Sequence, residues 1–231
     1  ALRAAEAPFY FEVLRSRART LAAKPYVPRT RTVPEAMIKL SYDEYRLILF
    51  DEEQTHWRRE DVPYQIQFSH PGFVHDRSVQ ISELKAGAVV PIKFSRSLFK
   101  YDGLKFPPGT PDPTGFAGFR ILGPLDRPWD ELASFLGASY FRSLAMNTVY
   151  GLSARGLAIN PTEPDGEEFP VFEEFWIERP APTAERFVIY ALMDSPSLAG
   201  AYRFTVVPGA DTVMDVKVAL YCRQNPRVLG I

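Results

Sequence analysis

The stretch Phe135–Arg179, FLGASYFRSLAMNTVYGLSARGLAINPTEPDGEEFPVFEEFWIER, determines the fold class that we expect for this chain. It contains three segments with strand character, and turn residues such as Asn, Pro, Asp and Gly lie between them. Short strand-like runs bounded by such residues are typical of antiparallel β proteins. Aromatic, arginine and carboxylate side chains recur along all three segments, so the same stretch also predicts where a ligand would bind.

Each of the three segments carries two chemically useful residues that are two positions apart. Residues with this spacing share one face of an extended strand. A face of Tyr, Trp, Arg and Glu suits a polyhydroxylated ligand, because rings cover the CH patches of a sugar and charged groups bind its hydroxyls. The alternative is that the rings belong to the core and the arginines form structural pairs. The three pairs are Tyr140 with Arg142, Ser153 with Arg155, and Glu174 with Trp176.

The rest of the chain repeats the strand pattern. In residues 64–69, Tyr64, Ile66 and Phe68 alternate with polar residues, which predicts a half-buried strand. Gly118 lies between aromatic residues and indicates a bend or the close approach of another backbone. Residues 129–132 are expected to form one helical turn. About ten strand candidates with regular turn signals predict a β-sandwich or barrel. Further strands are expected near residues 79–84, 89–94, 116–122, 186–193, 201–207 and 212–222.

The N-terminal region, residues 1–40, is expected to contain a helix and an extended linker, and residues 41–231 a β-sandwich domain. Apolar residues recur with helical spacing over residues 8–24, and arginines occupy much of the other face. We expect this helix to pack on the outside of a sheet; contact with a membrane surface is the alternative. Three prolines in residues 24–34 indicate an extended linker. Ser41 and Glu44 fit a capping box that begins a short helix.

Composition narrows the classes of function. The formal net charge of −1 and the sequence pI near 6.4 do not fit a nucleic-acid-binding surface. The single cysteine, Cys222, says little about the redox compartment. The apolar runs are shorter than the roughly 18 residues that a membrane span requires. The N-terminus lacks the apolar segment of a signal peptide, which fits either a cytoplasmic protein or one whose signal has been removed.

Catalytic patterns are sparse. His70 and His75 flank a Pro-Gly turn rather than forming a helical ligand pair, so we expect no metal site and no cofactor. A nucleophile elbow and a phosphate-binding glycine loop are both missing. Paired carboxylates remain an option, because glycoside hydrolysis uses two carboxyl groups. The candidates are Glu167, Glu168, Glu173 and Glu174; ordinary surface pairs are the alternative.

Six sequence words are long or unusual: FLGASYFR (135–142), YGLSARGLAI (150–159), GEEFPVFEEFWIERP (166–180), YALMDSPSLAGAYRF (190–204), HPGF (70–73) and GFAGFR (115–120). Together they resemble the periplasmic glucan biosynthesis protein G/D family. They keep the family's order from about Tyr42 to the C-terminus, which makes the resemblance specific.

The resemblance implies an all-β fold: a large, galactose-mutarotase-like antiparallel β-sandwich, here with an N-terminal helix. Family sequences continue through the rest of this domain and a smaller immunoglobulin-like domain, so the chain is expected to be incomplete relative to the family. The rest of the same protein, or a second chain, would then complete its sheet. The resemblance also implies a periplasmic location after removal of a signal peptide.

The implied function is the synthesis or remodelling of a β-1,2-linked glucan backbone. Some family members resemble endo-β-1,2-glucanases, but their catalytic acids belong to the sequence beyond this chain, so no catalytic residue is assigned here. The alternatives are a non-catalytic glucan-binding partner of a membrane glucosyltransferase and a structural module without a ligand. From residue type within the matching words, the expected glucan contacts are Tyr140, Arg142, Arg155, Glu168, Glu174 and Trp176.

Overall fold

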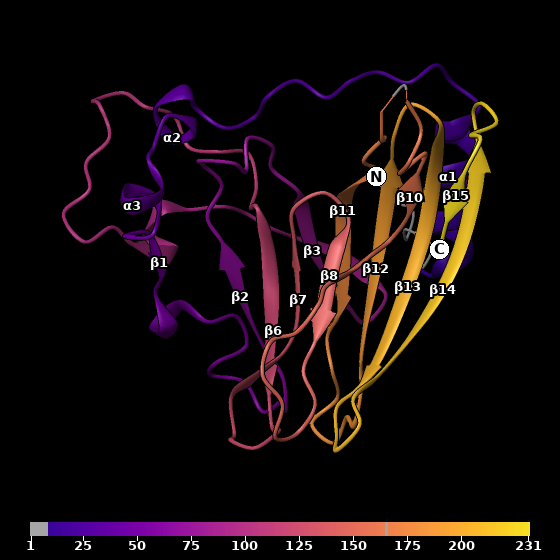
Figure 1. The fold of residues 1–231 in the computed structure, drawn as a ribbon. Helices are drawn as coiled ribbons and strands as arrows, with labels where there is room; N and C mark the ends of the chain where they lie inside the picture. The colour runs from indigo at the N-terminus through magenta and orange to yellow at the C-terminus, as the bar shows by residue number, and fades with distance from the viewer. Residues whose placement is uncertain (1–8, 165) are drawn as a thin grey trace, which may run out of the picture.

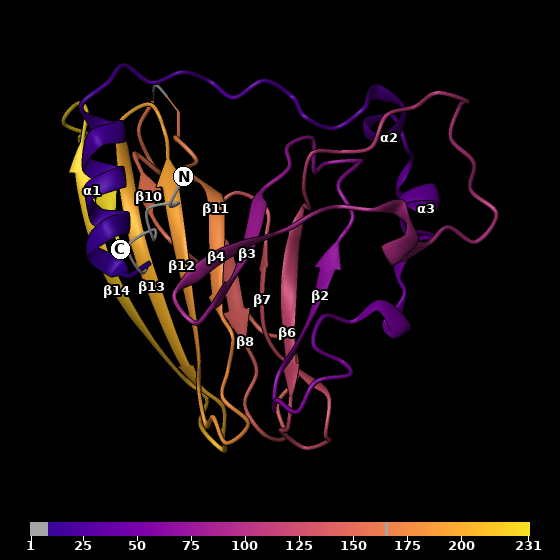
Figure 2. The same cartoon turned by 180° about the vertical axis from the view of Figure 1, so that it is seen from behind.

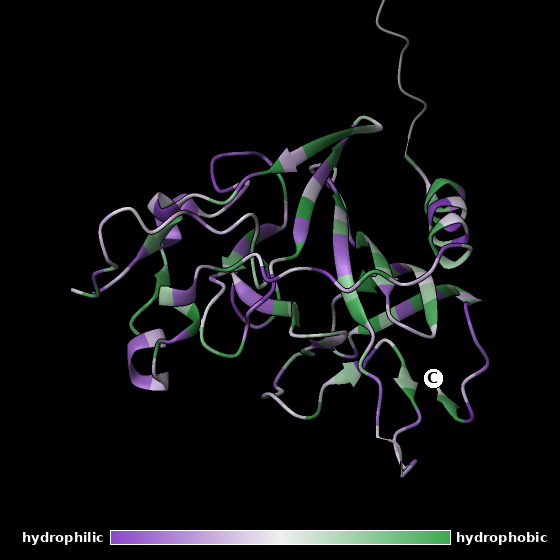
Figure 3. Cartoon of the chain, turned by 90° about the horizontal axis from the view of Figure 1, so that it is seen from above, coloured by the Kyte–Doolittle hydropathy of each residue, from purple (hydrophilic) through white to green (hydrophobic). Residues whose placement is uncertain are grey.

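Two β-sheets pack against each other and enclose the main hydrophobic core (Figure 1). The structure, a computed structural model, describes residues 9–164 and 166–231. Hydrophobic and hydrophilic residues alternate along many strands, as the green and purple bands of Figure 3 show. This alternation is typical of strands that have one face toward the core and one toward solvent. The all-β sandwich with an N-terminal helix that the sequence predicted is confirmed.

The larger sheet has six strands in the order β14-β13-β12-β11-β3-β4. All neighbours are antiparallel except β11 and β3, which run parallel. These strands are β3 (Gln80–Lys85), β4 (Ala88–Ile92), β11 (Val171–Glu178), β12 (Phe187–Asp194), β13 (Leu198–Val207) and β14 (Val213–Cys222).

The second sheet has five antiparallel strands in the order β2-β6-β7-β8-β9. Its strands are β2 (Gln65–Ser69), β6 (Gly118–Gly123), β7 (Asp130–Leu136), β8 (Tyr140–Ser143) and β9 (Ala154–Arg155). Two small pairs complete the β structure: β1 (Leu49–Phe50) with β5 (Phe99–Lys100), and β10 (Ala158–Ile159) with β15 (Leu229–Gly230).

Aromatic rings fill the space between the two sheets. The ring of Phe135 stacks on that of Phe119, with centroids 5.1 Å apart, and meets the ring of Phe204 edge-on at 5.0 Å. Phe175, from the six-stranded sheet, packs edge-on against Phe119 at 5.0 Å. Offset and edge-to-face rings add packing energy to the area they bury, so this cluster ties the two sheets together.

Helix α1 (Phe11–Ala22) lies on the outer face of the six-stranded sheet, across β12, β13 and β14 (Figure 2). Its apolar stripe buries Phe11, Leu14 and Ala18 against that face. The expected packing of this helix on a sheet is therefore confirmed. The structure begins the helix at Phe11, and the start predicted at Pro8 lies outside the described residues.

After α1, residues 24–34 form no helix or strand and run over one end of the sandwich (Figures 1 and 2). The predicted capping box is present: Glu44 N–H donates to Ser41 Oγ, and Ser41 N–H donates to the Glu44 carboxylate. The remaining helices are short: α2 (Glu35–Ile38), α3 (Tyr42–Tyr45), η1 (Glu52–Gln54) and η2 (Arg96–Leu98).

Two local predictions have clear outcomes. The helical turn predicted at residues 129–132 is wrong, because strand β7 begins at Asp130 and buries Leu132 in the core. Pairing with β6 overrides the local preference there. The prediction for Gly118 is confirmed, since a Cβ at this position would overlap the carbonyl oxygen of Phe135 on the neighbouring strand.

The stretch 135–179 is divided between the two sheets. Its first part supplies the end of β7 and then β8 and β9 of the five-stranded sheet, whereas its last part is β11 of the six-stranded sheet. The three segments therefore do not form one shared face, and this division decides which candidate residues can act together.

Candidate functional site

A row of four polar residues crosses the outer face of the five-stranded sheet. Gln67, Arg120, Ser134 and Arg142 lie opposite one another on β2, β6, β7 and β8. Their strand neighbours Phe68, Phe119, Phe135 and Phe141 point into the core, so the row faces away from it. We call this row, together with Glu131, Tyr150, Tyr140 and Arg155, the polar face.

Hydrogen bonds connect the row in pairs. The Arg120 guanidinium donates to Gln67 Oε1 from Nε at 3.0 Å and from Nη2 at 2.6 Å. Arg142 Nε donates to Ser134 Oγ at 3.0 Å. Gln67 is buried, whereas Arg120 is exposed and Arg142 is half-buried. The two arginines are thus held in place while parts of their guanidinium groups stay accessible to a ligand.

Glu131 and Tyr150 extend the row on one side. Arg120 Nη1 lies 3.5 Å from Glu131 Oε2, and Arg142 lies over the Tyr150 ring at 4.0 Å from its centroid. Burial, followed by a hydrogen bond to Glu131, raises the pKa of Tyr150 to about 12. Glu131 Oε1 is buried and has no hydrogen-bond partner within residues 9–164 and 166–231. Because this oxygen is closed to solvent, a ligand hydroxyl could reach it only if the side chains around it moved.

Tyr140 and Arg155 continue the polar face toward the end of the sheet. They lie opposite each other on β8 and β9. Arg155 forms an ion pair with Glu167, and its guanidinium lies 6.0 Å from the ring centre of Phe169. An aromatic ring therefore stands on the same side as the arginine, close to the edge of the sheet.

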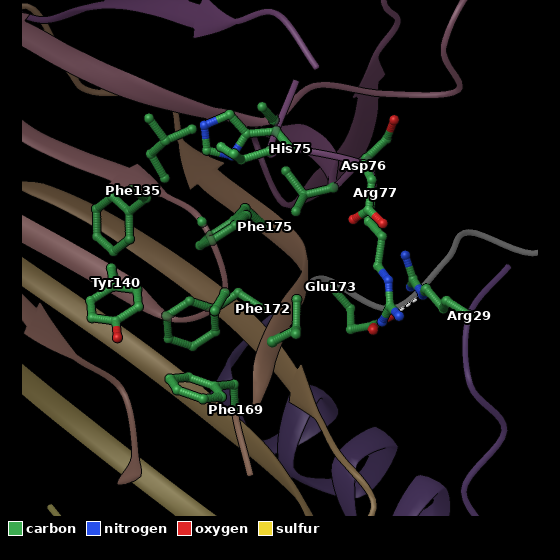
Figure 4. A pocket seen from close by; sticks show the side chains of 18 residues that line it. Arg29, His75, Asp76, Arg77, Phe135, Tyr140, Phe169, Phe172, Glu173 and Phe175 are labelled. Atoms are coloured by element: carbon green, nitrogen blue, oxygen red, sulfur yellow. Dashed lines mark ion pairs between the residues drawn. The ribbon is translucent and has the colours of Figure 1, made fainter. Parts of the chain in front are cut away.

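A cavity of about 350 Å³, which we call the end cavity, lies at this end of the sandwich. Figure 4 shows the rings of Phe135, Tyr140, Phe169 and Phe172 along one of its sides. Four charged residues occupy the other side: Arg29, Asp76, Arg77 and Glu173. His75 and Ser78 complete the polar part of the lining. Aromatic surface facing hydrogen-bonding groups is the usual composition of a small-molecule site.

The linker 24–34 is attached to residues that line the end cavity through three contacts. Arg29 forms an ion pair with the buried carboxylate of Glu173, and Arg31 pairs with Asp76 at 3.1 Å. The backbone N–H of Ser78 donates to Thr32 Oγ1 at 3.0 Å. Burial lowers the pKa of Arg29 below its ordinary value, although the guanidinium stays charged.

The structure brings only some of the predicted contact residues together. Tyr140, Arg142 and Arg155 share the polar face, whereas Glu168, Glu174 and Trp176 lie elsewhere. Glu168 accepts hydrogen bonds from the backbone N–H and the hydroxyl of Ser197, at 3.0 and 2.7 Å. It thereby stabilises the turn between β12 and β13.

Glu174 and Trp176 lie on the outer face of the six-stranded sheet, beneath helix α1. Glu174 pairs with Arg17 at 2.7 Å. The Trp176 side chain is 3% exposed, and it stacks on Phe9 with ring centroids 4.9 Å apart. A sugar could reach this ring only if α1 moved, so the position of Trp176 fits the alternative of a core residue.

Five residues of the polar face were missed by the sequence reasoning. The alternation around Gln67 indicated that its side chain pointed away from the core, but Arg120, Glu131, Ser134 and Tyr150 carried no comparable signal. Their proximity depends on which strands pair and in which register, and strand pairing is not contained in the local pattern of one strand.

The four carboxylates considered for acid–base catalysis all have partners inside the fold. Glu167 pairs with Arg155, Glu168 with Ser197, Glu173 with Arg29 and Glu174 with Arg17. Within the described residues, no group of three or more His, Cys, Asp or Glu side chains is arranged to hold a metal ion. No helix in the described part of the chain is long and apolar enough to cross a membrane.

His70 has a structural environment rather than a catalytic one. Its Nδ1–H donates to the Pro71 carbonyl at 2.5 Å, so Nε2 is the acceptor for the Tyr101 hydroxyl at 3.2 Å. The ring packs edge-on against Phe94, Phe99 and Tyr101. Burial lowers the pKa of His70 to about 4, so the imidazole is neutral at neutral pH.

These observations define a two-sheet β-sandwich protein with a polar sheet face and a cavity at one end. The family model described as periplasmic glucan biosynthesis protein, MdoG, matches residues 9–231. The chain belongs to this family, as the sequence words predicted, and the family's description refers to the periplasm.

Curated relatives agree with this assignment. The chain is 47% identical to glucans biosynthesis protein G of Ralstonia nicotianae over 100% of its length, which is 47% of that protein. The corresponding protein of Rhodopseudomonas palustris is 46% identical over 97% of the chain and 45% of the relative. The protein of Bradyrhizobium diazoefficiens is 48% identical over 94% of the chain, which corresponds to 44% of that relative. The chain thus spans about half the length of these relatives.

Proposed function

We propose that this chain is part of a periplasmic protein that builds or remodels a β-1,2-linked glucan, and that its polar face binds the glucan chain. The family supports a role in glucan biosynthesis. The observation that carries the proposal is the row of Gln67, Arg120, Ser134 and Arg142, which spans four strands of one sheet.

The chemistry of the polar face matches that of a sugar chain. The guanidinium groups of Arg120 and Arg142 provide charge-assisted donors for hydroxyl oxygens. The Tyr150 hydroxyl lies next to them and can donate to or accept from a sugar hydroxyl. The rings of Tyr140 and Tyr150 offer aromatic surface to the CH groups of a pyranose. Because four strands contribute, the face can contact more than one sugar unit.

Two roles for the whole protein follow from the same face. In the first, the protein is a hydrolase that trims the glucan, and its catalytic acids come from the half of the family sequence that this chain does not match. In the second, the protein is a non-catalytic partner that presents glucan to a membrane glucosyltransferase. The pairing of Glu167, Glu168, Glu173 and Glu174 inside the fold favours binding over catalysis for this chain.

A further partner is expected at the free edge of the larger sheet. Strand β14 is the last strand in the order of that sheet and runs for 10 residues. Its outer row of backbone N–H and C=O groups is a template for another strand. We propose that a strand from elsewhere in the same protein, or from a second chain, pairs with it.

The polar face is tested with linear β-1,2-glucan and the Arg142→Ala variant. Arg142 makes a hydrogen bond and a cation–π contact on the polar face, so its loss is expected to weaken glucan binding by about 10-fold, the value of one charge-assisted hydrogen bond. Arg15→Ala is the matched control, because Arg15 pairs with Glu12 on helix α1, on the opposite side of the molecule. Calorimetric titration measures the affinity of each variant.

Equal affinity of the native chain and a folded Arg142→Ala variant would remove the polar face from the proposal. Release of reducing ends is measured in parallel, with the chain and with the longer Ralstonia relative. New ends from the longer protein favour the hydrolase, and binding without new ends favours the partner of the glucosyltransferase. New ends from this chain would make Glu167, Glu168, Glu173 and Glu174 catalytic candidates again.

A further inference from the structure

The end cavity differs from the polar face in shape and in how it is closed. The polar face is a partly accessible sheet surface, whereas the end cavity is hollowed between two sets of side chains and Arg29 of the linker 24–34 lines one of them. Its volume, about 350 Å³, lies near the lower end of the range for small-molecule sites. Such a space suits one small ring system rather than a polymer that runs through.

The two walls of the end cavity have complementary chemistry. The exposed ring of Phe169 offers aromatic surface next to the buried ring of Phe172, and the Arg29–Glu173 ion pair lies across from them (Figure 4). Ser78 also lines the cavity. A pyranose ring has the same two-sided character, because its CH groups stack on aromatic rings while its hydroxyls form hydrogen bonds. A purely apolar ligand would leave the polar wall without partners.

Ser78 gives the lining of the end cavity an unused hydrogen-bonding group. The residue is 4% exposed and lines the cavity, and its hydroxyl has no hydrogen-bond partner in the part of the chain that the structure describes. Buried hydroxyls in native proteins are nearly always paired. A ligand hydroxyl in the cavity would supply the partner, since a hydroxyl both donates and accepts.

Most of the charges that line the cavity are already paired within the protein. Two arginines, Arg29 and Arg77, and two carboxylates, Asp76 and Glu173, line it. Arg29 is already paired with Glu173, and Asp76 is paired with Arg31. Burial also lowers the pKa of His75, which keeps its imidazole neutral at neutral pH. Arg77 remains without an ion-pair partner among the described residues, so its guanidinium disfavours a cation and can donate to the hydroxyls of a polyhydroxylated ring.

Tyr140 connects the two regions. It lies on β8 at the end of the polar face, opposite Arg155, and it also lines the end cavity. We infer that a glucan chain lies along the polar face and that the end cavity binds its terminal sugar ring. This inference rests on the proposed function for the identity of the sugar, and it adds that the protein recognises a chain end.

The inference is tested by NMR titration of the chain with methyl β-D-glucoside, a single ring that can occupy the cavity without any polymer. We expect the amide signals of Ser78 and Phe172 to shift on titration. Ser78→Ala should weaken binding at least threefold, and because it removes only an unpaired hydroxyl, the fold should persist. Phe169→Ala should weaken binding at least fivefold; Phe169 is 52% exposed, so its loss leaves the core intact.

Trp129→Ala is the matched control for the loss of an exposed aromatic ring. Trp129 is 48% exposed and precedes β7, at the end of that strand opposite to the cavity. The control should bind methyl β-D-glucoside like the native chain. Binding that is unchanged in both Ser78→Ala and Phe169→Ala would overturn the placement of the sugar in the cavity.

Titration with linear β-1,2-glucan separates this inference from the proposed function. If the polymer binds through Arg142 but methyl β-D-glucoside leaves the cavity signals unmoved, terminal recognition is overturned and the polar face stands. If neither ligand binds, both proposals fall. Binding of both ligands, with the monosaccharide sensitive to Ser78→Ala and Phe169→Ala, supports the two proposals together.

Discussion

Arg29 and Glu173 form an ion pair that joins the linker to strand β11 at the end of the sandwich. Both residues line the end cavity, and both also line a groove of about 700 Å³ between helix α1 and the sheet. The pair therefore stands at the boundary between the two hollows. Glu173 is 7% exposed, so its charge depends on the arginine for compensation.

Arg29→Ala is expected to destabilise the protein by about 1–3 kcal/mol, because it leaves the Glu173 carboxylate buried without its partner. The value is set below that of a fully buried pair because the Arg29 side chain is 35% exposed. Urea denaturation at pH 7 measures the loss. Adding Glu173→Gln to this variant should restore part of the stability, and a double variant less stable than either single variant would contradict the explanation.

Gly118→Ala is expected to cost at least about 2 kcal/mol in the free energy of unfolding. The new Cβ would overlap the backbone carbonyl oxygen of Phe135, and a backbone atom inside a sheet cannot turn aside as a side chain can. Gly151→Ala is the matched control, since a Cβ there would meet no atom of the described chain within 4 Å beyond its own neighbours in sequence. Thermal or urea unfolding of the two variants should differ clearly, and equal stability would show that β6 and β7 can separate locally.

Trp176→Ala is expected to reduce stability by about 3–5 kcal/mol, as is usual for removal of a large buried ring. The loss would come from the contacts between α1 and the sheet, where Trp176 meets Phe9 and the Arg17 guanidinium. Glucan affinity, measured at a temperature where the variant stays folded, should equal that of the native chain. A weaker affinity with unchanged stability would instead return Trp176 to the glucan site.

His70 is expected to make stability depend on pH between about 4 and 6.5. The pKa of His70 is about 4 in the folded chain and near 6.5 in an unfolded one, so the unfolded state binds the proton more readily. Stability therefore falls as pH drops through this window, by up to about 3 kcal/mol from this group. Urea denaturation at pH 7 and pH 4.5 measures the change.

The variant His70→Asn isolates this contribution from those of His56 and His75, whose pKa values burial also lowers. Its stability should change less between pH 7 and pH 4.5 than that of the native chain, whatever its stability at pH 7. An equal pH dependence in the two proteins would show that other groups cause the effect.

The sequence predicted secondary-structure elements correctly where a short, characteristic residue pattern marks them. The capping box at Ser41 and Glu44 and the helix with Leu14 and Ala18 on its buried stripe followed from interactions between residues close in sequence. The glycine at position 118 was predicted from its aromatic neighbours in sequence, although the atom that requires it belongs to Phe135 on the next strand. The helical turn at residues 129–132 failed because long-range pairing with β6 outweighed local preference. Whether a segment forms a strand depends on how its side chains pack against the neighbouring strands, and the sequence of that segment alone does not show these neighbours.

The candidate site was predicted in part. Tyr140, Arg142 and Arg155 lie together, because the first two share one strand and the third pairs with it. Glu174 and Trp176 have the same two-residue spacing, but their strand joined the other sheet and helix α1 covered them. Residue pairs with the same two-residue spacing therefore lie in different environments. The spacing determines which face of the strand carries both side chains, but it does not determine which element packs against that face.

The amino-acid sequence by itself determined the β-rich class, the helix with its apolar stripe, the turn positions and the family, because these depend on residues close together in the chain or on long matching words. Only the tertiary structure decided that Gln67, Arg120, Ser134 and Arg142 form one row, and that Ser78 and Phe169 face one cavity. The physical reason is that strand order and register are set by the collective burial of both sheets, which brings distant residues together.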